Sequence, residues 1–243
     1  MRFKRSPGRI PEGLEDCLFT QEYVQAHRMQ ARRCLNIMGL PTDSRILDIG
    51  CGTAGATVPL SVILGHVIGL DISTQMLNVA RKRARLSQAA ISLVVADMLR
   101  LPFEKASFDG IACMDVTFGY FGPDGDLQQV REMGRCLRPG GRLFIETFDK
   151  QYGMNNPGAP DTGQYWGTYN SETDRFTGLN LYSPGQWRRM LSSAGMKILR
   201  VLSADDYSLS YMEYCQGHQF IIILASRQQP YASSHRLGQE GPF

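Results

Sequence analysis

Apolar and polar stretches alternate along the first two thirds of the chain in a pattern that predicts βα repeats. Residues 45–71 read RILDIGCGTAGATVPLSVILGHVIGLD: an apolar run, a glycine turn, an apolar stretch of helical length and a second apolar run ending in an acid. This order predicts strand, turn, helix and strand, the opening unit of a nucleotide-binding sheet. Further strands are expected at Ile91–Ala96, which is continuously apolar as if buried on both faces, at Phe108–Met114 and at Arg142–Thr147. The alternation implies a parallel sheet with helices on both faces.

Capping and stop residues place the helices that separate these strands. A helix is expected from Thr20 to about Met38, one from about Thr74 to Leu86 behind the cap Ser73, one from near Asp124 to Cys136, and one begun by Ser183 and Pro184 and ended by Gly195. Beyond Phe148 the repeat breaks into a polar, glycine-rich and aromatic stretch. The last two strands are then expected at Met196–Leu202 and Gln219–Ser226.

The glycine turn predicts a nucleotide ligand. Gly50, Gly52 and Gly55 satisfy G-x-G-x-x-G, and Asp71 lies at about the 20-residue distance at which an acid binds a ribose. Taken alone, this fingerprint predicts NAD. Asp48, two positions before the first glycine, is expected to point into the ligand crevice, where a carboxylate repels a pyrophosphate and attracts an ammonium or sulfonium. Asp48 therefore favours S-adenosylmethionine over NAD.

Five motifs follow one another in a fixed order. They are Ile46–Gly52 (ILDIGCG), Val67–Asp71 followed by Ile72 and Ser73, Val94–Asp97, Phe108–Asp115 and Leu137–Phe144 (LRPGGRLF). In this order the chain resembles the class I S-adenosylmethionine-dependent methyltransferases over roughly Asp43–Arg227. The resemblance implies a Rossmann-like α/β fold: a seven-stranded, mostly parallel sheet whose last strand is antiparallel and inserted between its two predecessors. The alternative is a Rossmann-like domain that binds no such cofactor.

The resemblance also divides the chain. Residues 1–42 form a lead-in and a cofactor-covering helix, 43–148 the S-adenosylmethionine-binding core, 149–182 a substrate-side insertion, 183–227 the C-terminal part of the core, and 228–243 a disordered tail. Within the insertion, a hairpin is expected between Tyr165–Thr168 and Thr177–Tyr182.

Four acids are expected at the carboxyl ends of the strands, where open α/β sheets bind ligands. They are Asp48, Asp71, Asp97 and Asp115. The resemblance assigns roles at this edge: Asp71 accepts from both ribose hydroxyls, Ile72 lies on the adenine face, Asp97 and the Met98 backbone bind the adenine edge, and Gly50 and Gly52 admit the methionine part. For any single acid, a helix cap or loop solvation would explain it equally well.

The N-terminal helix contributes two further candidates through the resemblance, because related enzymes close such a helix over the cofactor. Tyr23 and Arg28 are therefore candidates to bind the methionine carboxylate. In the alternative, Arg28, Arg32 and Arg33 form a solvated face. The histidines His27 and His218, and the phenol of Tyr120, are weak candidates for a catalytic base.

The segment after the fourth strand is informative about the methyl acceptor. It reads DVTFGYF where many class I enzymes that methylate nucleic acids or proteins have N-P-P-Y, and it therefore resembles the branch acting on small molecules. Phe118, Tyr120 and Phe121 are candidates to line the pocket beside the sulfonium; packing under the next helix is the alternative. Trp166, Tyr207 and Tyr211 are candidates for a lid over the acceptor, or for an oligomer contact.

Composition narrows the partners. The 243 residues carry a net charge of only +3, and the basic cluster at 81–85 lacks interleaved aromatics, so it is interpreted as a solvated helix face rather than a nucleic-acid site. The six cysteines have no C-x-x-C spacing, which predicts reduced, buried thiols of a cytoplasmic protein and no metal site. Uninterrupted apolar stretches stay below the roughly 18 residues of a membrane helix, so a soluble protein is expected.

These observations predict an enzyme that transfers a methyl group from S-adenosylmethionine to a small, partly apolar molecule and releases S-adenosylhomocysteine. Such an in-line displacement requires proximity and a dry cavity but no protein nucleophile. The rivals are an enzyme that uses the sulfonium only electrostatically, a binding module without turnover, and an RNA methyltransferase. The acceptor, the methylated atom and the choice between monomer and homodimer stay open.

Overall fold

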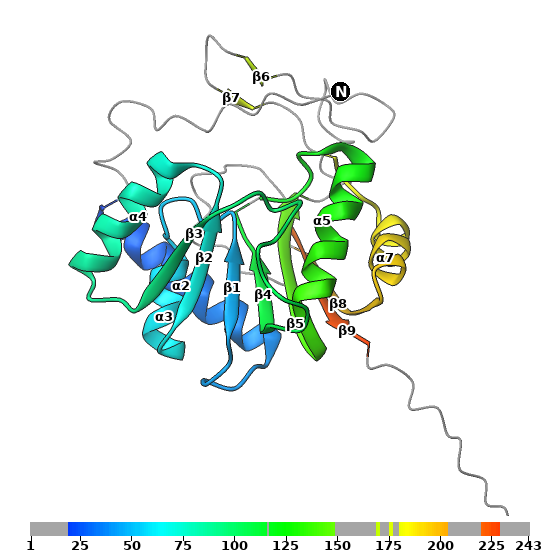
Figure 1. Ribbon diagram of the computed structural model, residues 1–243, viewed down its shortest axis with the longest axis horizontal. Coiled ribbons are helices and arrows are strands. Elements are labelled where there is room, and N and C mark those ends of the chain that lie inside the picture. Colours follow the sequence, from blue (N-terminus) through cyan, green and yellow to red (C-terminus); the bar gives the residue numbers. More distant parts are fainter. Residues whose placement is uncertain are drawn as a thin grey trace, which may run out of the picture.

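A seven-stranded sheet in the order β3-β2-β1-β4-β5-β9-β8 forms the centre of the molecule (Figure 1). The structure, a computed structural model, describes residues 19–115, 117–148, 169–170, 175–176, 180–203 and 220–228. The elements are α2 (Gln21–Met38), β1 (Ile46–Ile49), α3 (Thr57–Leu64), β2 (Val67–Asp71), α4 (Thr74–Leu86), β3 (Ile91–Val95), β4 (Phe108–Cys113), α5 (Gly122–Cys136), β5 (Leu137–Phe148), β6 (Tyr169–Asn170), β7 (Arg175–Phe176), α7 (Pro184–Ser193), β8 (Met196–Ser203) and β9 (Phe220–Arg227).

The strand directions confirm the predicted topology. β1 pairs in parallel with β2 and β4, and β4 pairs in parallel with β5. β9 is antiparallel to both β5 and β8 and lies between them, so the last strand is inserted as expected. The continuous apolar run Phe220–Ala225 suits this interior position, since Ile221–Ala225 are buried.

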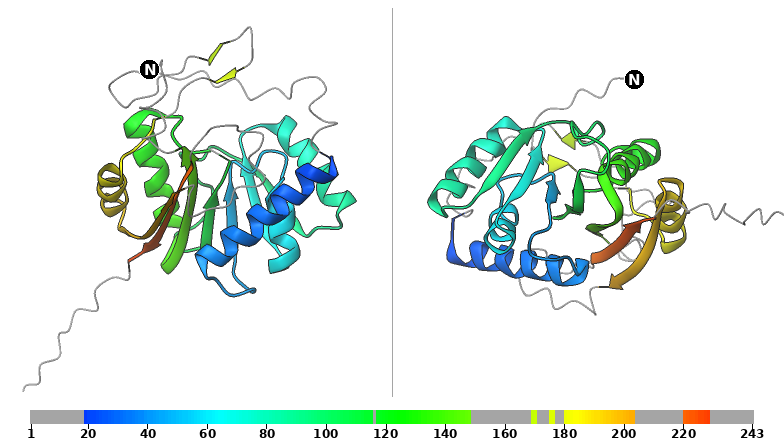
Figure 2. Two further views of the ribbon diagram at one scale, coloured as in Figure 1. Left: turned by 180° about the vertical axis from the view of Figure 1, so that it is seen from behind. Right: turned by 60° about the horizontal axis from the view of Figure 1, so that its bottom comes forward.

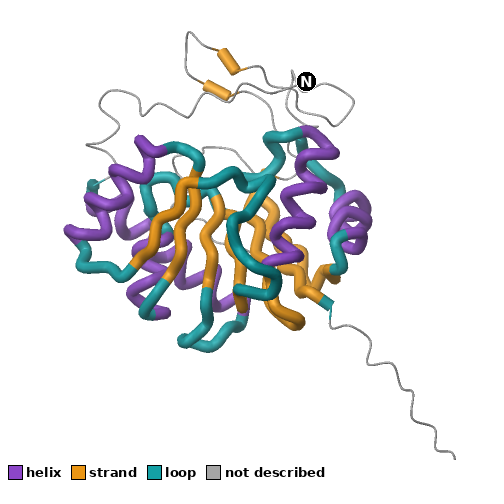
Figure 3. The backbone as a smooth tube through the Cα atoms, in the orientation of Figure 1, coloured by secondary structure: helices purple, strands orange, loops and turns teal. Residues whose placement is uncertain are grey.

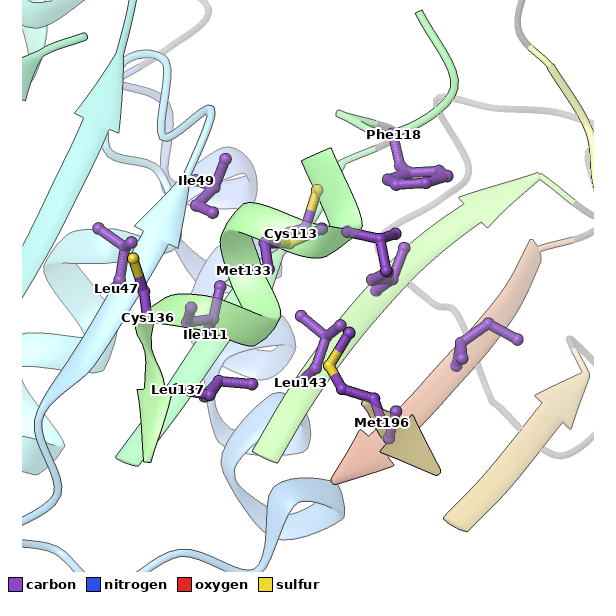
Figure 4. Close-up of a cluster of buried hydrophobic side chains, with 14 of the residues drawn as sticks. Leu47, Ile49, Ile111, Cys113, Phe118, Met133, Cys136, Leu137, Leu143 and Met196 are labelled. Carbon is purple, nitrogen blue, oxygen red and sulfur yellow. The ribbon is translucent and has the colours of Figure 1, made fainter. Parts of the chain in front are cut away.

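Helices cover both faces of the sheet, with the strands at the centre (Figures 2 and 3). The alternation of side chains along β1 shows how the two layers are built: Ile46 packs with α2 and α3, whereas Leu47 and Ile49 pack in the cluster that contains α5 and α7. Figure 4 shows this second cluster beneath α5, with Phe118 on the side of the strand carboxyl ends. The odd and even positions of one strand therefore serve different cores.

The helix starts are those the caps predict. Thr20 accepts from the Tyr23 backbone N–H at 3.2 Å, Ser73 accepts from the Met76 N–H at 3.3 Å, and Ser183 forms a reciprocal capping box with Gln186. Gly39, in a left-handed conformation, ends α2. These side chains satisfy orphan N–H groups at the helix ends, which explains why local sequence was sufficient to find them.

Several expected elements need correction. Among the described strands β3 pairs with β2 alone and forms one edge of the sheet. It is half exposed, with Val95 at 50% exposure, so it is not a strand buried on both faces. β5 begins at Leu137, earlier than expected, because that residue pairs with Phe108 before the glycine turn. In the insertion, the described pairing is Tyr169–Asn170 with Arg175–Phe176, inside the hairpin that the sequence predicted. Tyr165–Thr168 and Thr177–Leu179 lie outside the described residues.

Two expectations, on membrane helices and on the state of the cysteines, can be compared with the described residues. None of their helices combines the length and the apolar character that a membrane crossing needs. Cys34, Cys51, Cys113 and Cys136 are buried free thiols, as expected for cysteines that act as small apolar residues. Cys17 and Cys215 lie outside the described residues.

Candidate functional site

The glycine turn after β1 leaves room for a ligand. The Gly50 and Cys51 N–H groups both donate to the Leu70 carbonyl, at 2.7 and 3.0 Å, and tie the turn to the end of β2. Gly50 and Gly52 have φ angles of +70° and +51°. A Cβ at Gly52 would meet nothing within 4 Å, so the turn presents open space at that position.

Asp71 is held across this turn from the end of β2. One carboxylate oxygen accepts from the Gly52 N–H at 2.9 Å and the other from the Ser73 N–H at 2.8 Å. Both oxygens retain lone pairs for further donors, since a carboxylate has about four acceptor sites. Ile72, beside it, is 39% exposed and is therefore accessible to a ligand.

Asp97 stands after β3, next to the end of β2. Its carboxylate accepts from the Leu99 N–H at 2.9 Å and is only partly buried. The neighbouring Met98 sulfur accepts from the amide of Gln129, at 3.2 Å. Because Asp71 pairs with Val95, the two acids lie at adjacent strand ends, where the sequence placed them.

Asp48 does not point into open crevice space, which corrects the expectation. As an even position of β1 it lies on the side of α2 and α3, where it is 3% exposed and its Oδ2 accepts from the Thr57 hydroxyl at 2.6 Å. Burial raises its pKa from 3.8 to about 7; the Thr57 hydrogen bond opposes this rise, and the charges of Asp115 and Asp71 add to it. Asp48 is therefore a buried support of the turn whose charge depends on its surroundings.

The raised pKa makes stability depend on pH. The pKa of Asp48 is 3.8 in the unfolded chain and about 7 in the folded protein. Between these pH values the folded state binds more protons than the unfolded state, so the free energy of unfolding falls as pH rises. Asp48→Asn should abolish this loss: its free energy of unfolding should fall less than that of the wild type between about pH 5 and pH 8, by roughly 2–3 kcal/mol. Urea unfolding at both pH values measures this. An equal fall in both proteins would contradict the assignment, and Asp109→Asn, at the opposite end of the sheet, is the control.

A polar network joins α2 to the ends of β4 and β5. The fully buried Gln30 amide donates to Asp115 Oδ1 at 2.6 Å and to Glu146 Oε1 at 3.4 Å. Asp115 has a φ of +51° and its side chain is 50% exposed, so it reaches the surface from a strained turn. Sequence analysis missed Gln30 and Glu146. The available signal was a polar residue inside an otherwise apolar stripe or strand.

A second contact holds α2 against the glycine turn. The Tyr23 hydroxyl lies 3.4 Å from the Thr53 hydroxyl, and the Tyr23 and His27 rings stack at 4.0 Å. Gly55 allows this approach: a Cβ there would lie 2.6 Å from the His27 ring and 2.7 Å from the Tyr23 hydroxyl. Arg28, by contrast, is exposed on α2, which fits the solvated-face alternative better than a ligand contact.

The segment after β4 is held by the packing of Phe118 in the core. Phe118 is fully buried and packs on Trp187 at 4.9 Å and on Tyr182 at 6.1 Å between ring centroids. This corrects the expectation that Phe118 lines a pocket and favours the alternative of packing under a helix. Tyr120 is 37% exposed and Phe121 is half-buried, so these two remain available to a ligand.

Asp126, which sequence analysis also missed, ties this segment to residues 180–182. Its fully buried carboxylate accepts from the Phe121 N–H, the Asn180 amide and the Tyr182 hydroxyl, at 3.1, 2.9 and 2.7 Å. Asn180 also donates to the Gly119 carbonyl at 3.0 Å. The loop after β4 is thus fixed to residues 180–182, the last residues of the expected insertion.

Phe118→Leu should lower the free energy of unfolding by about 1–2 kcal/mol, because it removes ring contacts from a closed core. Phe121→Leu is the matched control and should cost less, since Phe121 is only half-buried. Chemical denaturation of the two variants checks the difference. A smaller loss at Phe118 than at Phe121 would restore the pocket assignment.

The geometry described so far can now be compared with known proteins. Residues 46–141 match the family model of the methyltransferase domain. They form a class I methyltransferase domain. The family that the motif order predicted is thereby confirmed for this core.

Curated relatives cover the same part of the chain. A demethylmenaquinone methyltransferase of Staphylococcus saprophyticus is 35% identical over 127 residues, which span 51% of this chain and 53% of that protein. A demethylmenaquinone methyltransferase of Staphylococcus aureus is 34% identical over 127 residues, or 51% of each chain. The chain therefore spans about half the length of the curated relatives it matches.

Solved structures share the fold over most of the chain at low identity. A SAM-dependent methyltransferase from Methanosarcina mazei has a TM-score of 0.63 and 22% identity, over 79% of this chain and 95% of that one. The [4+2]-cyclase SpnF has a TM-score of 0.64 and 20% identity, over 85% of this chain and 83% of that one. At these identities the likeness shows the fold alone.

The candidate catalytic bases can now be placed in the structure. His27 is buried, and because a carbonyl only accepts, its Nδ1 donates to the Tyr23 carbonyl at 2.8 Å while Nε2 faces Asp115 at 3.6 Å. This geometry favours a structural role. Desolvation, helped by Cys113, raises the pKa of Tyr120 to about 12, so near neutral pH its phenol stays protonated and does not act as a base. His218, Trp166, Tyr207 and Tyr211 lie outside the described residues.

Proposed function

We propose that the protein transfers a methyl group from S-adenosylmethionine to a small, partly apolar acceptor. One observation carries the proposal: in a methyltransferase domain, Asp71, Asp97 and Asp115 stand at the carboxyl ends of β2, β3 and β4 around an open glycine turn. Ligands of open α/β sheets bind at this edge. An acid beside an exposed apolar side chain, as in Asp71 and Ile72, suits a nucleoside with its two ribose hydroxyls and its flat base.

The residues present fit this cofactor. The open position at Gly52 admits backbone contact with the methionine part, and the carboxylates of Asp71 and Asp97 suit the ribose hydroxyls and the adenine amino group. When bound, S-adenosylmethionine supplies a methyl group on a positively charged sulfur. Asp115, which is half exposed, and the buried Asp48 place negative charge near that cation. A cation there would favour the ionised form of Asp48 and oppose the effect of burial on its pKa.

The candidate bases in the described part of the chain, His27 and Tyr120, are not placed for proton abstraction, so the described residues are expected to supply orientation and a dry environment. During transfer the bond from sulfur to the methyl carbon breaks, its electron pair stays on sulfur, and the acceptor atom forms the new bond. Among the described residues, His27 is buried and Tyr120 stays protonated at neutral pH. The acceptor is therefore expected to arrive as its anion or as an unprotonated atom, or to lose its proton to water. Tyr120 can donate a hydrogen bond to an acceptor oxygen.

The curated relatives support a small apolar acceptor. Those from Staphylococcus are named for demethylmenaquinone, and their match covers only about half of either chain. The burial of Arg83 at 4% exposure removes one charge from the basic cluster of α4, which weakens the RNA alternative further. An acceptor of the quinone class, in its oxidised or reduced form, is therefore the first to examine.

A second candidate function is catalysis without methyl transfer. The observation that favours it is the shared fold with a protein named as a [4+2]-cyclase. Because a likeness of 20% identity extends only to the fold, methyl transfer and such a rearrangement are both compatible with this architecture. Consumption of the cofactor separates them.

The test is turnover of the purified full chain with S-adenosylmethionine and a panel of quinones, hydroquinones, phenols, amines, carboxylates and RNA. The expected result is S-adenosylhomocysteine formed in equal amount with one methylated acceptor, and none without acceptor. A converted acceptor with S-adenosylmethionine unchanged would support the second candidate. Absence of S-adenosylmethionine binding by calorimetry would overturn both, and methylation of RNA alone would overturn the small-molecule acceptor.

A further inference from the structure

Arg83 belongs to the basic cluster of α4 but is buried rather than solvated. Sequence analysis placed it on a solvated face of α4, but it is 4% exposed, whereas its neighbours Arg81 and Lys82 are exposed. Burying a guanidinium is costly unless hydrogen bonds and ring contacts replace its water. Its partners therefore indicate what the buried charge does.

The partners come from the two parts of the structure that surround the proposed cofactor site. The Arg83 Nε donates to the Thr53 carbonyl, inside the glycine turn, at 2.9 Å. The guanidinium carbon lies 4.8 Å from the centre of the Tyr23 ring, in α2, and 4.9 Å from that of Phe19. These are cation–π distances, and a planar guanidinium can stack and donate at the same time.

The remaining contacts close a ring. The Tyr23 hydroxyl reaches back to the Thr53 side chain at 3.4 Å, so Arg83, Thr53 and Tyr23 contact one another in turn. They come from α4, the glycine turn and α2, which are far apart in the sequence. Next to Thr53, Gly52 donates to Asp71 at 2.9 Å, and Asp71 is held independently of this ring by the Ser73 N–H at 2.8 Å.

We propose that Arg83 is a positioning residue for the cofactor: by binding the Thr53 carbonyl and the Tyr23 ring, it holds the glycine turn and α2 together around the methionine end of the ligand. The inference rests on the proposed function. Arg83 acts through other residues and does not contact the reacting atoms. The adenosine end, assigned to Asp71, Ile72 and Asp97, lies on other loops and does not depend on this contact.

The test compares two ligands that share the adenosine part. S-adenosylhomocysteine and adenosine are titrated by calorimetry into the wild type, Arg83→Gln and Arg83→Lys. Arg83→Gln is expected to raise the Kd of S-adenosylhomocysteine by about tenfold or more, as for loss of a charge-assisted hydrogen bond, and to leave the Kd of adenosine within about twofold. Arg83→Lys keeps the positive charge but loses the planar guanidinium that stacks on Tyr23. Its Kd for S-adenosylhomocysteine is therefore expected to lie between those of the wild type and Arg83→Gln.

Two controls separate positioning from folding. Arg81→Gln removes a neighbouring exposed arginine of α4, whose guanidinium bonds only within the helix to Asn78 at 2.7 Å among the contacts described, and should change neither Kd. Tyr23→Phe should weaken S-adenosylhomocysteine less in the Arg83→Gln background than in the wild type, because the two residues act on the same turn.

Equal weakening of both ligands, or a lower melting temperature with both Kd values unchanged, would show that Arg83 only stabilises the fold and would overturn the inference. If Arg83→Gln does not fold, an unchanged Kd of S-adenosylhomocysteine in Arg83→Lys would overturn it as well. If the wild type binds adenosine and S-adenosylhomocysteine equally or not at all, the proposed function fails before the role of Arg83 is reached.

Discussion

Asp71→Asn is expected to raise the Kd of S-adenosylhomocysteine by roughly 10- to 100-fold, the effect of losing charge-assisted hydrogen bonds worth about 1.5–3 kcal/mol. In the structure, the two oxygens of Asp71 accept from the Gly52 and Ser73 N–H groups. An asparagine offers one oxygen and turns an N–H₂ group toward a backbone donor. The substitution therefore weakens the proposed ribose contact and loosens the glycine turn.

Calorimetric titration measures this effect, and the control is a carboxylate of similar bonding at the other end of the sheet. Asp109 accepts from the Arg45 N–H at 2.9 Å and from Arg138 at 2.6 Å, at the start of β4. Asp109→Asn should leave the Kd unchanged. A Kd in Asp71→Asn equal to that of the wild type would show that Asp71 is not part of the cofactor site. If the wild type binds NADH more tightly than S-adenosylhomocysteine, the G-x-G-x-x-G motif indicates a dinucleotide site instead.

Gly50→Ala should abolish measurable S-adenosylhomocysteine binding and lower the free energy of unfolding by about 2–5 kcal/mol, the sum of left-handed strain and overpacking. Gly50 has a φ of +70°, and a Cβ there would lie 2.0 Å from the Thr117 Cγ2 atom. Thr117 has little freedom to move, because its hydroxyl donates to the Met114 carbonyl at 2.6 Å. The turn and the segment after β4 would be forced apart.

Two variants divide this effect into its parts by urea unfolding and calorimetry. Gly140→Ala is the control, because Gly140 has a similar φ of +82° and open space around a Cβ, so it should show the strain of about 1–2 kcal/mol alone. Adding Thr117→Ser to Gly50→Ala removes the clashing methyl group and should recover part of the stability. Equal losses in Gly50→Ala and Gly140→Ala would mean that the contact with Thr117 does not constrain the turn.

The interior of the sheet was predictable because its signals are local. Ser73 and Ser183 cap their helices through contacts three residues away, and the apolar run of β9 matches a strand between two others. The acids Asp71, Asp97 and Asp115 were found because strand ends in a parallel sheet converge on one edge. The edge position of β3 was missed, since an apolar strand has the same sequence pattern whether one or both of its sides are paired.

Long-range contacts decided the rest. Three buried polar residues, Gln30, Asp126 and Glu146, were missed because their partners are distant in the sequence. Gln30 bonds to Glu146, 116 residues away, and Asp126 bonds to Asn180, 54 residues away. Phe118 was assigned to a pocket because an aromatic residue after a strand suits a ligand and a core equally. Only the approach of Trp187 and Tyr182 distinguishes the two.

The sequence by itself determined the order of strands and helices, the glycine turn and the acids at the strand ends, because periodicity, caps and motif spacing are properties of neighbouring residues. The tertiary structure decided which side chains are buried, because burial depends on what packs against them. It turned Asp48 toward α3, where burial raises its pKa to about 7, and enclosed Arg83 between α2 and the glycine turn. Both residues are charged types at positions whose environment no local pattern records.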